Sequence, residues 1–391
     1  MLQFPYMGTK QALAPIVADA ARRADAGPFL DVFAGMCSVA NAVQTDRCVW
    51  TNDLQCFAVT AAKSMLCDPV AAAALFDDFE TAAREHYMGL CSRFRLALRH
   101  ERLALASSDF DQFASRNALA NNSIDRRSNR AFDLFSTTYA NTYIGIEQAI
   151  EIDSLIFALN CVCGSPIQGS AVRRKFLFAL GRTLLRVSTT TGHFAQYQTP
   201  SERNWKRFQR TRRLSVMELF RSDYTKAFSS AGPAQENNQA FNMDAISLLR
   251  SLRRVPTRPA VVYADPPYKQ DQYSRYYHLL ETLVLYDYPR VTGKAKYRVS
   301  RSPSVFSSKS KSKRGIEALS SLTSSLGADF ILSYPEDGIA DIPKDEMLMI
   351  MSSNFASVEL VHEGILRHST MGASKGTAKQ PVIERIYLGR N

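Results

Sequence analysis

Four consecutive residues have the side chains and backbone constraints that suit chemistry on an amino group: Asp265, Pro266, Pro267 and Tyr268. The two prolines restrict the backbone and carry no N–H, so the turn offers carbonyl oxygens without donors. Asp265 adds a carboxylate that accepts hydrogen bonds, and Tyr268 adds a flat aromatic face with a polar end. Acceptors beside an aromatic ring suit a planar base that carries an amino group.

The apolar run before this turn indicates how the four residues are positioned. Residues 259–262 are Pro-Ala-Val-Val, which predicts a buried strand that ends in a rigid turn. In open α/β sheets, ligands bind outside the carboxyl ends of the strands, so Asp265 and Tyr268 would stand where chemistry is usually done. The alternative is a proline-rich strand exit without chemistry, because a four-residue motif is only a hypothesis.

Residues 265–268 resemble the Asp-Pro-Pro-Tyr motif of the adenine-N(6) DNA methyltransferases. The resemblance implies that the acceptors hold an amino group, draw its lone pair out of conjugation with the ring and aim it at the methyl group of S-adenosylmethionine. It also implies that adenine leaves the duplex and stacks on Tyr268, while Asp265 and the Pro266 carbonyl hold the amino hydrogens. Asp265 then serves as a catalytic residue and also contacts the cofactor.

Composition favours a polyanionic partner. The chain has 391 residues, of which 46% are hydrophobic and 22% charged, as is typical of a globular protein. Its 48 Lys and Arg outnumber 37 Asp and Glu, and the net charge of +11 points first to nucleic acid and second to a membrane surface. No basic amphipathic helix and no apolar run of transmembrane length stands out, so double-stranded DNA is the expected partner.

The N-terminus and the cysteines indicate the compartment. Residues 1–5 show no charged stretch followed by an apolar core, so we expect no signal peptide. Seven cysteines, an odd number scattered through apolar segments, favour reduced thiols in the cytoplasm over a disulfide framework. Only Cys161 and Cys163 are close together, and no second pair follows at zinc-finger spacing, so we expect no metal centre.

A second motif lies near the start of the chain, where residues 28–32 predict a strand, followed by a glycine turn and a helix over 38–43. Such a turn lets backbone N–H groups approach a ligand, although the G-x-G-x-x-G dinucleotide pattern is not met. The segment resembles the family's Phe-x-Gly-x-Gly cofactor loop, which implies cofactor contacts from Asp31, Phe33, Ala34 and Gly35. Cys37 occupies the position of the second glycine, and we expect its thiol to crowd the methionine part of the cofactor.

Four further residues complete the expected cofactor site. Tyr6 and Lys10 resemble the family's N-terminal Tyr/Trp-x-Gly-x-Lys element, and an ordinary helix entry is the alternative. Asp53 follows a predicted strand, where an acid hydrogen-bonds ribose hydroxyls in nucleotide-binding folds; an Asn-Asp turn with a helix cap is the alternative. Asp244 ends a short strand, and the resemblance implies that it accepts from the cofactor's adenine amino group, a role that can coexist with a helix N-cap.

Between the cofactor loop and the catalytic turn, the apolar periodicity is mostly helical. It predicts helices over residues 72–79, 87–105, 147–159 and 172–187, with an exposed polar loop over 121–130. An insertion of this size has two interpretations. It is either a module that recognises the DNA target or a helical cap that only stabilises the sheet.

Hydroxyl, aromatic and basic residues near the end of this insertion favour DNA recognition. His193 lies in a segment that resembles the family's Thr-x-Gly-His-Phe, although a lone histidine is equally often structural. Residues 203–213 alternate basic and aromatic side chains, which contact phosphates or read base edges. The predicted DNA-binding residues there are Arg203, Lys206, Arg207 and Arg210, with a solvated charged face as the alternative.

Two segments after the catalytic turn extend the predicted DNA contacts. In residues 269–282, which resemble a segment of some of these enzymes, Tyr273 would stack on an extruded base and Arg275 would touch phosphate; core packing is the alternative for the tyrosine. Residues 293–314 are rich in Lys, Arg and Ser and lack any acid, so we expect a mobile loop that orders on DNA, or a linker. Predicted core strands follow, over residues 330–334, 357–362 and 383–388, the last after a Gly/Ser/Lys loop over 372–379.

The order of these elements resembles the alpha-group, Dam-like adenine methyltransferases over most of the chain. The resemblance implies an α/β fold with a Rossmann-like class I methyltransferase sheet, helices on both faces, and a mostly helical inserted target-recognition domain. The expected domains are residues 1–66 with 236–391 for S-adenosylmethionine binding and catalysis, and 67–235 for DNA recognition. A cognate restriction endonuclease is a further expected partner. The alternatives are an amino-group methyltransferase acting on cytosine or RNA, and a DNA-binding module with a decayed cofactor site.

Overall fold

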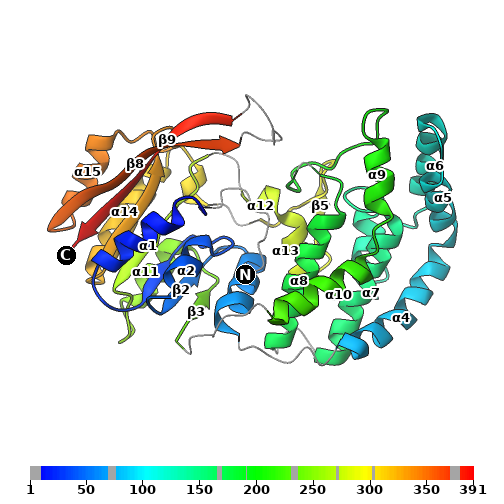
Figure 1. The fold of residues 1–391 in the computed structure, drawn as a ribbon, viewed down its shortest axis with the longest axis horizontal. Coiled ribbons are helices and arrows are strands. Elements are labelled where there is room, and N and C mark those ends of the chain that lie inside the picture. The colour runs from blue at the N-terminus through cyan, green and yellow to red at the C-terminus, as the bar shows by residue number, and fades with distance from the viewer. Residues whose placement is uncertain are drawn as a thin grey trace. The chain divides into compact units, whose positions relative to one another are not determined.

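The computed structural model of the chain is shown in Figure 1. It describes residues 10–68, 76–164, 170–190, 192–229, 237–269, 273–301, 304–369 and 379–391. No helix within these ranges is both long enough and apolar enough to cross a membrane. The predicted loop over residues 372–379 falls almost entirely outside the described residues, as does Tyr6.

The described residues form two compact units. The sheet unit comprises residues within Tyr6–Asp68, Pro233–Arg275 and Arg301–Asn391, and the helical unit comprises residues within Pro69–Gly232 and Tyr276–Ser300. Residues 276–300 therefore group with the helical unit, whereas the sequence placed them in the catalytic domain. The reason lies in side-chain contacts: the Tyr286 and Tyr288 hydroxyls accept the backbone N–H groups of Leu134 and Asp133 at 3.3 and 3.1 Å.

The sheet unit is built on a mostly parallel seven-stranded sheet, in the order β3-β2-β1-β4-β7-β9-β8 across the described residues. The strands are β1 Phe29–Asp31, β2 Val49–Asn52, β3 Gln239–Phe241, β4 Val261–Ala264, β7 Asp329–Pro335, β8 Ser357–Ser369 and β9 Lys379–Arg390. β9 is antiparallel to both of its neighbours, β7 and β8, and the other pairings in this sheet are parallel. β1, β2, β4 and β7 are buried along their whole length, which is why their sequences read as nearly continuous apolar runs.

Helices cover both faces of this sheet, because successive side chains of a strand point to opposite faces. Phe29 and Val261 pack in one apolar cluster with helices α1 and α2, whereas their chain neighbours Leu30 and Val262 pack in another with α11, α14 and α15. The helices of this unit are α1 Ala14–Arg23, α2 Ser38–Val43, α3 Cys56–Ala62, the π-helix η1 Lys63–Cys67, α11 Ala245–Leu252, the 3₁₀ turn η3 Val305–Ser307, α14 Ser312–Ser325 and α15 Lys344–Ser352. The predicted helix over 38–43 and the predicted strands are confirmed.

The helical unit consists of helices and one short hairpin. Its elements are α4 Phe76–Arg93, α5 Arg95–Leu105, α6 Phe110–Asn122, the π-helix η2 Phe135–Tyr139, α7 Ile146–Cys163, α8 Ala171–Val187, α9 Trp205–Arg212, α10 Val216–Ser229, α13 His278–Leu285, β5 Val291–Thr292 and β6 Tyr297–Arg298. The short helix α12 Tyr273–Tyr276 crosses from one unit to the other. The single helix predicted over 87–105 is wrong, since the chain is interrupted at Phe94. Helix α6 was not predicted, because its apolar residues are few.

Two buried carboxylates stabilise helix ends in the helical unit. Glu101 accepts the N–H groups of Ile146 and Glu147 at 2.7 and 2.9 Å, at the start of α7. Glu151 accepts the Val216 N–H at 2.8 Å, at the start of α10. The first N–H groups of a helix have no partner within the helix and carry partial positive charge, so these acids satisfy them and fix how the helices meet.

The mobile loop predicted over residues 293–314 is wrong for the part that the structure describes. Arg298 lies in β6 and makes a two-point ion pair with Asp287, at 2.7 and 2.6 Å. Phe306 lies in η3 and is buried in the sheet unit against Gly315 of α14, where a β-carbon would come within 2.7 Å of its ring. The local composition is basic and polar, but the partners of these side chains come from outside the segment.

Candidate active site

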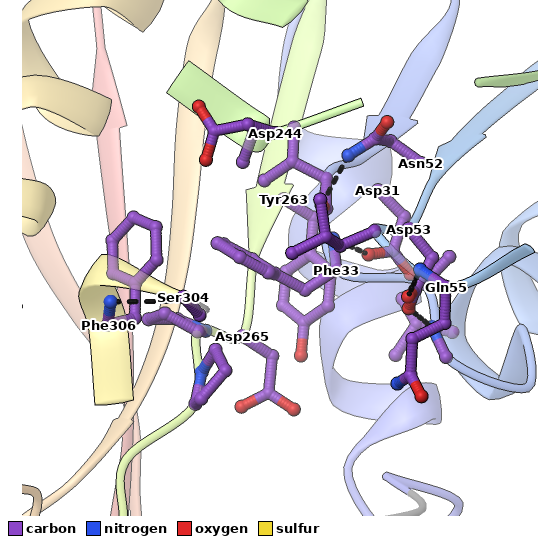
Figure 2. A pocket seen from close by; sticks show the side chains of 18 of the residues that line it. Asp31, Phe33, Asn52, Asp53, Gln55, Asp244, Tyr263, Asp265, Ser304 and Phe306 are labelled. Carbon is purple, nitrogen blue, oxygen red and sulfur yellow. Dashed lines mark hydrogen bonds between the residues drawn. The ribbon is translucent and has the colours of Figure 1, made fainter. Parts of the chain in front are cut away.

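The carboxyl ends of β1 and β4 meet where the strand order reverses. From β1 the chain moves outward to β2 and β3, and β4 then lies on the other side of β1, with Asp31 in register with Tyr263. Open α/β sheets bind ligands in the crevice at such a reversal. Side chains from these ends line a pocket (Figure 2). Its lining includes Lys10, Asp31, Phe33, Ala34, Gly35, Asn52, Asp53, Met243, Asp244, Asp265, Pro266, Pro267, Tyr268, Ser304 and Phe306.

The turn after β1 forms one wall of the pocket. Asp31 is buried at the strand end, and its Oδ1 accepts the Phe33 N–H at 3.1 Å. Burial is the main cause that raises the pKa of Asp31, with Asp265 and Asp53 adding to it and the Phe33 hydrogen bond opposing it. Gly35 adopts a left-handed backbone with φ of 47°, which glycine tolerates better than other residues.

Cys37 does not crowd this wall, contrary to the sequence-based expectation. Its side chain is 1% exposed and packs in the apolar cluster of α1 and α2, and it is not among the residues that line the pocket. The backbone at Cys37 is left-handed, with φ of 60°, and its side chain packs in this cluster. Replacement of the second glycine therefore strains the backbone rather than narrowing the pocket, at a cost of about 1–2 kcal/mol.

Asp53 connects the ends of β1 and β2. One carboxylate oxygen accepts the Gly35 N–H at 3.0 Å and the other accepts the Gln55 N–H at 2.9 Å. The second contact is the turn that the sequence offered as an alternative to ribose binding. Because Asp53 also lines the pocket, the turn and a ligand contact are compatible.

Asp244 and Asn52 organise the third strand end. Asp244 caps α11 by accepting the Ser247 N–H at 3.0 Å, and it also lines the pocket. The N-cap role is confirmed. The buried Asn52 amide donates to the Val32 and Met243 carbonyls at 3.1 and 3.0 Å and accepts the Met243 N–H at 3.1 Å. Sequence analysis missed Asn52, although a polar residue at the end of an apolar strand was the available signal.

The predicted catalytic turn opens into the same pocket and carries a buried ion pair. The Lys10 Nζ lies 3.2 Å from Asp265 Oδ1 and 3.0 Å from Glu384 Oε1, and 5.1 Å from the centre of the Tyr268 ring. Lys10 is 7% and Asp265 14% exposed, and Glu384 is fully buried. Burial lowers the pKa of Lys10, but the attraction of Asp265 and Glu384 outweighs it, so the net pKa is raised and the ammonium stays charged.

Phe306 of η3 and Ser304, which caps the start of η3, line the pocket on the side opposite β2, and sequence analysis did not identify them. The Phe306 and Phe33 rings meet edge to face with centres 5.0 Å apart (Figure 2). The Ser304 hydroxyl oxygen accepts the Phe306 N–H at 3.3 Å at the start of this turn. The available signal was an aromatic residue, Phe306, in a serine- and lysine-rich stretch just before a helix.

The charged side chains that line the pocket are mostly acidic. Among the described residues they are Asp31, Asp53, Asp244 and Asp265, together with one cation, Lys10. Figure 2 shows the Asp265 and Asp244 carboxylates extending from different strand ends into this region. Such a pocket attracts a cationic ligand and offers acceptors to hydroxyl and amino groups. Among the described residues, no group of three or more His, Cys, Asp or Glu side chains is arranged to hold a metal ion.

The basic residues predicted to bind DNA lie on one exposed face of the helical unit. Arg203 precedes α9, and Lys206, Arg207 and Arg210 follow on the helix at spacings that share one side; all four are exposed. The interleaved aromatic residues are buried instead: Trp205 and Phe208 pack with Ala104 and Phe113. The exposed face of α9 therefore presents cations without aromatic rings.

The remaining predicted DNA contacts have different surroundings. His193 is 6% exposed, its Nδ1 accepts the Ala195 N–H at 3.2 Å, and its ring meets Tyr276 edge to face at 5.0 Å. Burial lowers the pKa of His193, and the ring packs inside the helical unit, so its role in DNA binding stays a prediction. Arg275 is exposed on α12, and the side chain of Tyr273 lies outside the described residues.

Comparison with known proteins gives a family and several relatives. Residues 6–327 match the family model described as D12 class N6 adenine-specific DNA methyltransferase. The chain is 28% identical over 254 residues to modification methylase LlaI of Lactococcus lactis subsp. lactis, across 64% of this chain and 37% of the relative. It is 24% identical over 340 residues to modification methylase StsI of Streptococcus sanguinis, across 85% of this chain and 44% of that relative. It is also 28% identical over 157 residues to type II methyltransferase M.FokI of Planomicrobium okeanokoites, across 40% of this chain and 21% of that relative. The chain spans less than half the length of each relative.

Proposed function

We propose that this chain, which belongs to the family of D12 class N6 adenine-specific DNA methyltransferases, transfers a methyl group from S-adenosylmethionine to the exocyclic amino group of adenine at specific sites in DNA. The observation that carries the proposal is the meeting of two features in one pocket. The acceptor-rich turn of Asp265 and Pro266 opens into the same space as the acidic strand ends of β1, β2 and β3. A methyl donor and an amino acceptor would therefore be brought together.

The residues of the pocket fit S-adenosylmethionine, which carries a sulfonium cation, ribose hydroxyls and an adenine ring. The excess of acidic side chains favours the cation, and the Phe33 and Phe306 rings offer apolar surface to the adenine ring. In this proposal Asp53 accepts from the ribose hydroxyls and Asp244 from the adenine amino group; both line the pocket. When bound there, the cofactor supplies an activated methyl group.

The catalytic turn then holds the amino group of the target base. Asp265 and the Pro266 carbonyl accept its hydrogens and draw its lone pair out of conjugation, and Tyr268 stacks on the ring. The Lys10 ammonium, 3.2 Å from Asp265 Oδ1, holds the carboxylate that receives the amino group in place. Asp265 has no need to deprotonate the amine in advance, because the methylated cationic product loses its proton readily.

The helical unit supplies target recognition in this proposal. The exposed face formed by Arg203, Lys206, Arg207 and Arg210 fits the phosphate backbone, since cations contact phosphates without regard to sequence. Gln209, the neighbouring residue that could read a base edge, donates instead to the Leu105 carbonyl at 3.0 Å. We therefore assign this face to positioning on DNA, with Arg275 as a further phosphate contact.

The test is nucleoside analysis of DNA incubated with the purified chain and S-adenosylmethionine. The proposal expects N6-methyladenine, and calorimetry should show binding of the cofactor. N4-methylcytosine or methylation of RNA alone would support the alternative of another amino-group methyltransferase. Binding to DNA without binding to S-adenosylmethionine would support a decayed cofactor site. Two relatives are named modification methylases. We therefore propose that this chain also acts as a modification methylase, beside a cognate restriction endonuclease.

A further inference from the structure

A buried glutamate stands behind the catalytic turn. Glu384 lies on β9, the antiparallel strand, where it is in register with Pro335 of β7. It is fully buried and does not line the pocket, whereas its partner Lys10 does. The contact between Glu384 and Lys10 joins positions 374 apart in the chain. Glu384 therefore contacts a pocket residue, Lys10, from outside the pocket lining.

The three charged groups are connected by two contacts that lead from the buried Glu384 to the pocket. Glu384 Oε1 is 3.0 Å from the Lys10 Nζ, which is 3.2 Å from Asp265 Oδ1. A buried ion pair is stable only when its partners stay matched, because an unpartnered buried charge is strongly destabilising. Glu384 thus holds the long, otherwise mobile lysine side chain in one place. Glu384 also balances part of the positive charge of Lys10, so that Asp265 remains a strong hydrogen-bond acceptor.

We infer that Glu384 is a positioning residue for methyl transfer, which fixes the Lys10 ammonium against Asp265 and thereby orients the carboxylate that receives the amino group. The inference rests on the function proposed above. Glu384 does not line the pocket, and its contact with the pocket residue Lys10 is the route by which it positions the catalytic turn. No motif in the sequence points to this residue.

Two ion pairs between the β8–β9 hairpin and neighbouring helices are exposed instead. Glu359 and Glu363 of β8 pair with Arg23 and Lys344, and the four side chains are all between 35% and 41% exposed. Exposed ion pairs contribute about 0–1 kcal/mol to the free energy of unfolding, and these two do not orient any residue that lines the pocket. Glu359 therefore serves as a matched control: it is the same residue type, on the same hairpin, in an ion pair with a helix of the N-terminal segment.

The charge relation also predicts a change in pH dependence. The groups that face the Lys10 ammonium are Asp265 after β4, Glu384 on β9 and the Tyr268 ring. In Glu384→Gln, one of the attractions that raise the pKa of Lys10 disappears, while burial still lowers it. Lys10 then loses its proton at lower pH, so the alkaline limb of kcat moves to lower pH. A purely structural glutamate would leave that limb in place.

The experiment compares wild type, Glu384→Gln and Glu359→Gln for kcat, KM for DNA and the pH profile of kcat. Glu384→Gln should lower kcat by about 10- to 100-fold, the loss expected when a catalytic group is misplaced by about 1 Å, with a smaller change in KM. Glu359→Gln should match wild type. If Glu384→Gln fails to fold, Glu384→Asp replaces it, because its shorter side chain cannot keep the 3.0 Å contact; it should give the same direction of change.

A double-mutant cycle separates positioning from folding. In a Lys10→Met background, Glu384→Gln should change kcat by less than about twofold, because residues that act through one another are not additive. An equal loss with and without Lys10, or a lowered melting temperature with unchanged kcat and pH profile, would overturn the inference while wild-type methylation of adenine stands. Absence of N6-methyladenine with the wild-type chain would overturn the proposed function and this inference together.

Discussion

The Gly35 N–H donates to the Asp53 carboxylate over 3.0 Å, which ties the turn after β1 to the end of β2. The same carboxylate also accepts the Gln55 N–H at 2.9 Å. The backbone of the predicted cofactor loop is thus fixed by a residue that itself lines the pocket. Loop geometry and ligand contact therefore depend on one side chain.

Asp53→Ala should weaken binding of S-adenosylmethionine. The substitution leaves the Gly35 N–H without its acceptor and removes the proposed ribose contact, a loss of about 1–3 kcal/mol or roughly 10- to 100-fold in Kd. Calorimetry measures the change. Asp46→Ala removes an exposed ion pair with Arg22 and should leave Kd unchanged. An Asp53→Ala protein that binds the cofactor as tightly as wild type would contradict both roles of Asp53.

Cys37→Ala should affect stability and not the cofactor. The thiol is buried in the cluster of α1 and α2, so its truncation should lower the free energy of unfolding by about 1 kcal/mol. The Kd for S-adenosylmethionine should stay within about twofold of wild type, because the thiol does not line the pocket. Chemical denaturation and calorimetry check the two quantities. A tighter Kd in the alanine variant would mean that the thiol crowds the cofactor after all.

The acidic residues at the strand ends were predictable, because each follows an apolar run in the sequence. Asp31, Asp53 and Asp265 each follow a short hydrophobic segment, and parallel strands bring their carboxyl ends to one edge of the sheet. Local pattern and sheet geometry were therefore enough to predict that these acids gather. The same reasoning located Asp244, although its strand β3 ends three residues earlier, at Phe241.

Contacts between distant segments were not predictable in this way. Glu384 reaches Lys10 only because β9 inserts beside β7, and Phe306 reaches Phe33 only because η3 returns to the sheet unit. His193 was predicted to contact DNA, but Tyr276 packs against it from a segment more than eighty positions later. Hydrophobic periodicity describes one element at a time and contains no information about such partners.

Substitutions on the exposed face of α9 should weaken DNA binding without altering sequence preference. Arg207→Ala or Arg210→Ala removes a proposed phosphate contact, so affinity should fall similarly for all sequences and the salt slope should decrease by about 1. Fluorescence anisotropy at several salt concentrations measures both. Leu214→Ala, an exposed apolar truncation just after α9, is the control and should bind as wild type does. An unchanged salt slope in both arginine variants would remove α9 from the interface.

Lys296 should make the helical unit less stable at neutral pH than at alkaline pH. Burial, with a smaller effect of Arg126, lowers the pKa of Lys296 from 10.5 to about 8. Between these values the unfolded chain binds the proton and the folded chain does not, so stability rises with pH across that window and the full penalty applies below about pH 8.

Lys296→Met should therefore be more stable than wild type at pH 7, and the difference should shrink as the pH rises toward 10.5. Hydrogen exchange of the β5–β6 hairpin reports on this region directly. Lys226→Met, which replaces an exposed lysine of α10, should follow the wild-type pH dependence. A constant difference between Lys296→Met and wild type across the window would show that the lysine does not titrate there.

The central claim is that Asp265 holds the amino group that receives the methyl group. The most direct measurement is the single-turnover rate of methylation by Asp265→Ala, with DNA affinity measured on the same preparation. We predict that turnover is abolished while the Kd for DNA stays close to that of wild type, because the proposed phosphate contacts, which supply most of the affinity, are made by other residues. Methylation at the wild-type rate by Asp265→Ala would contradict the account.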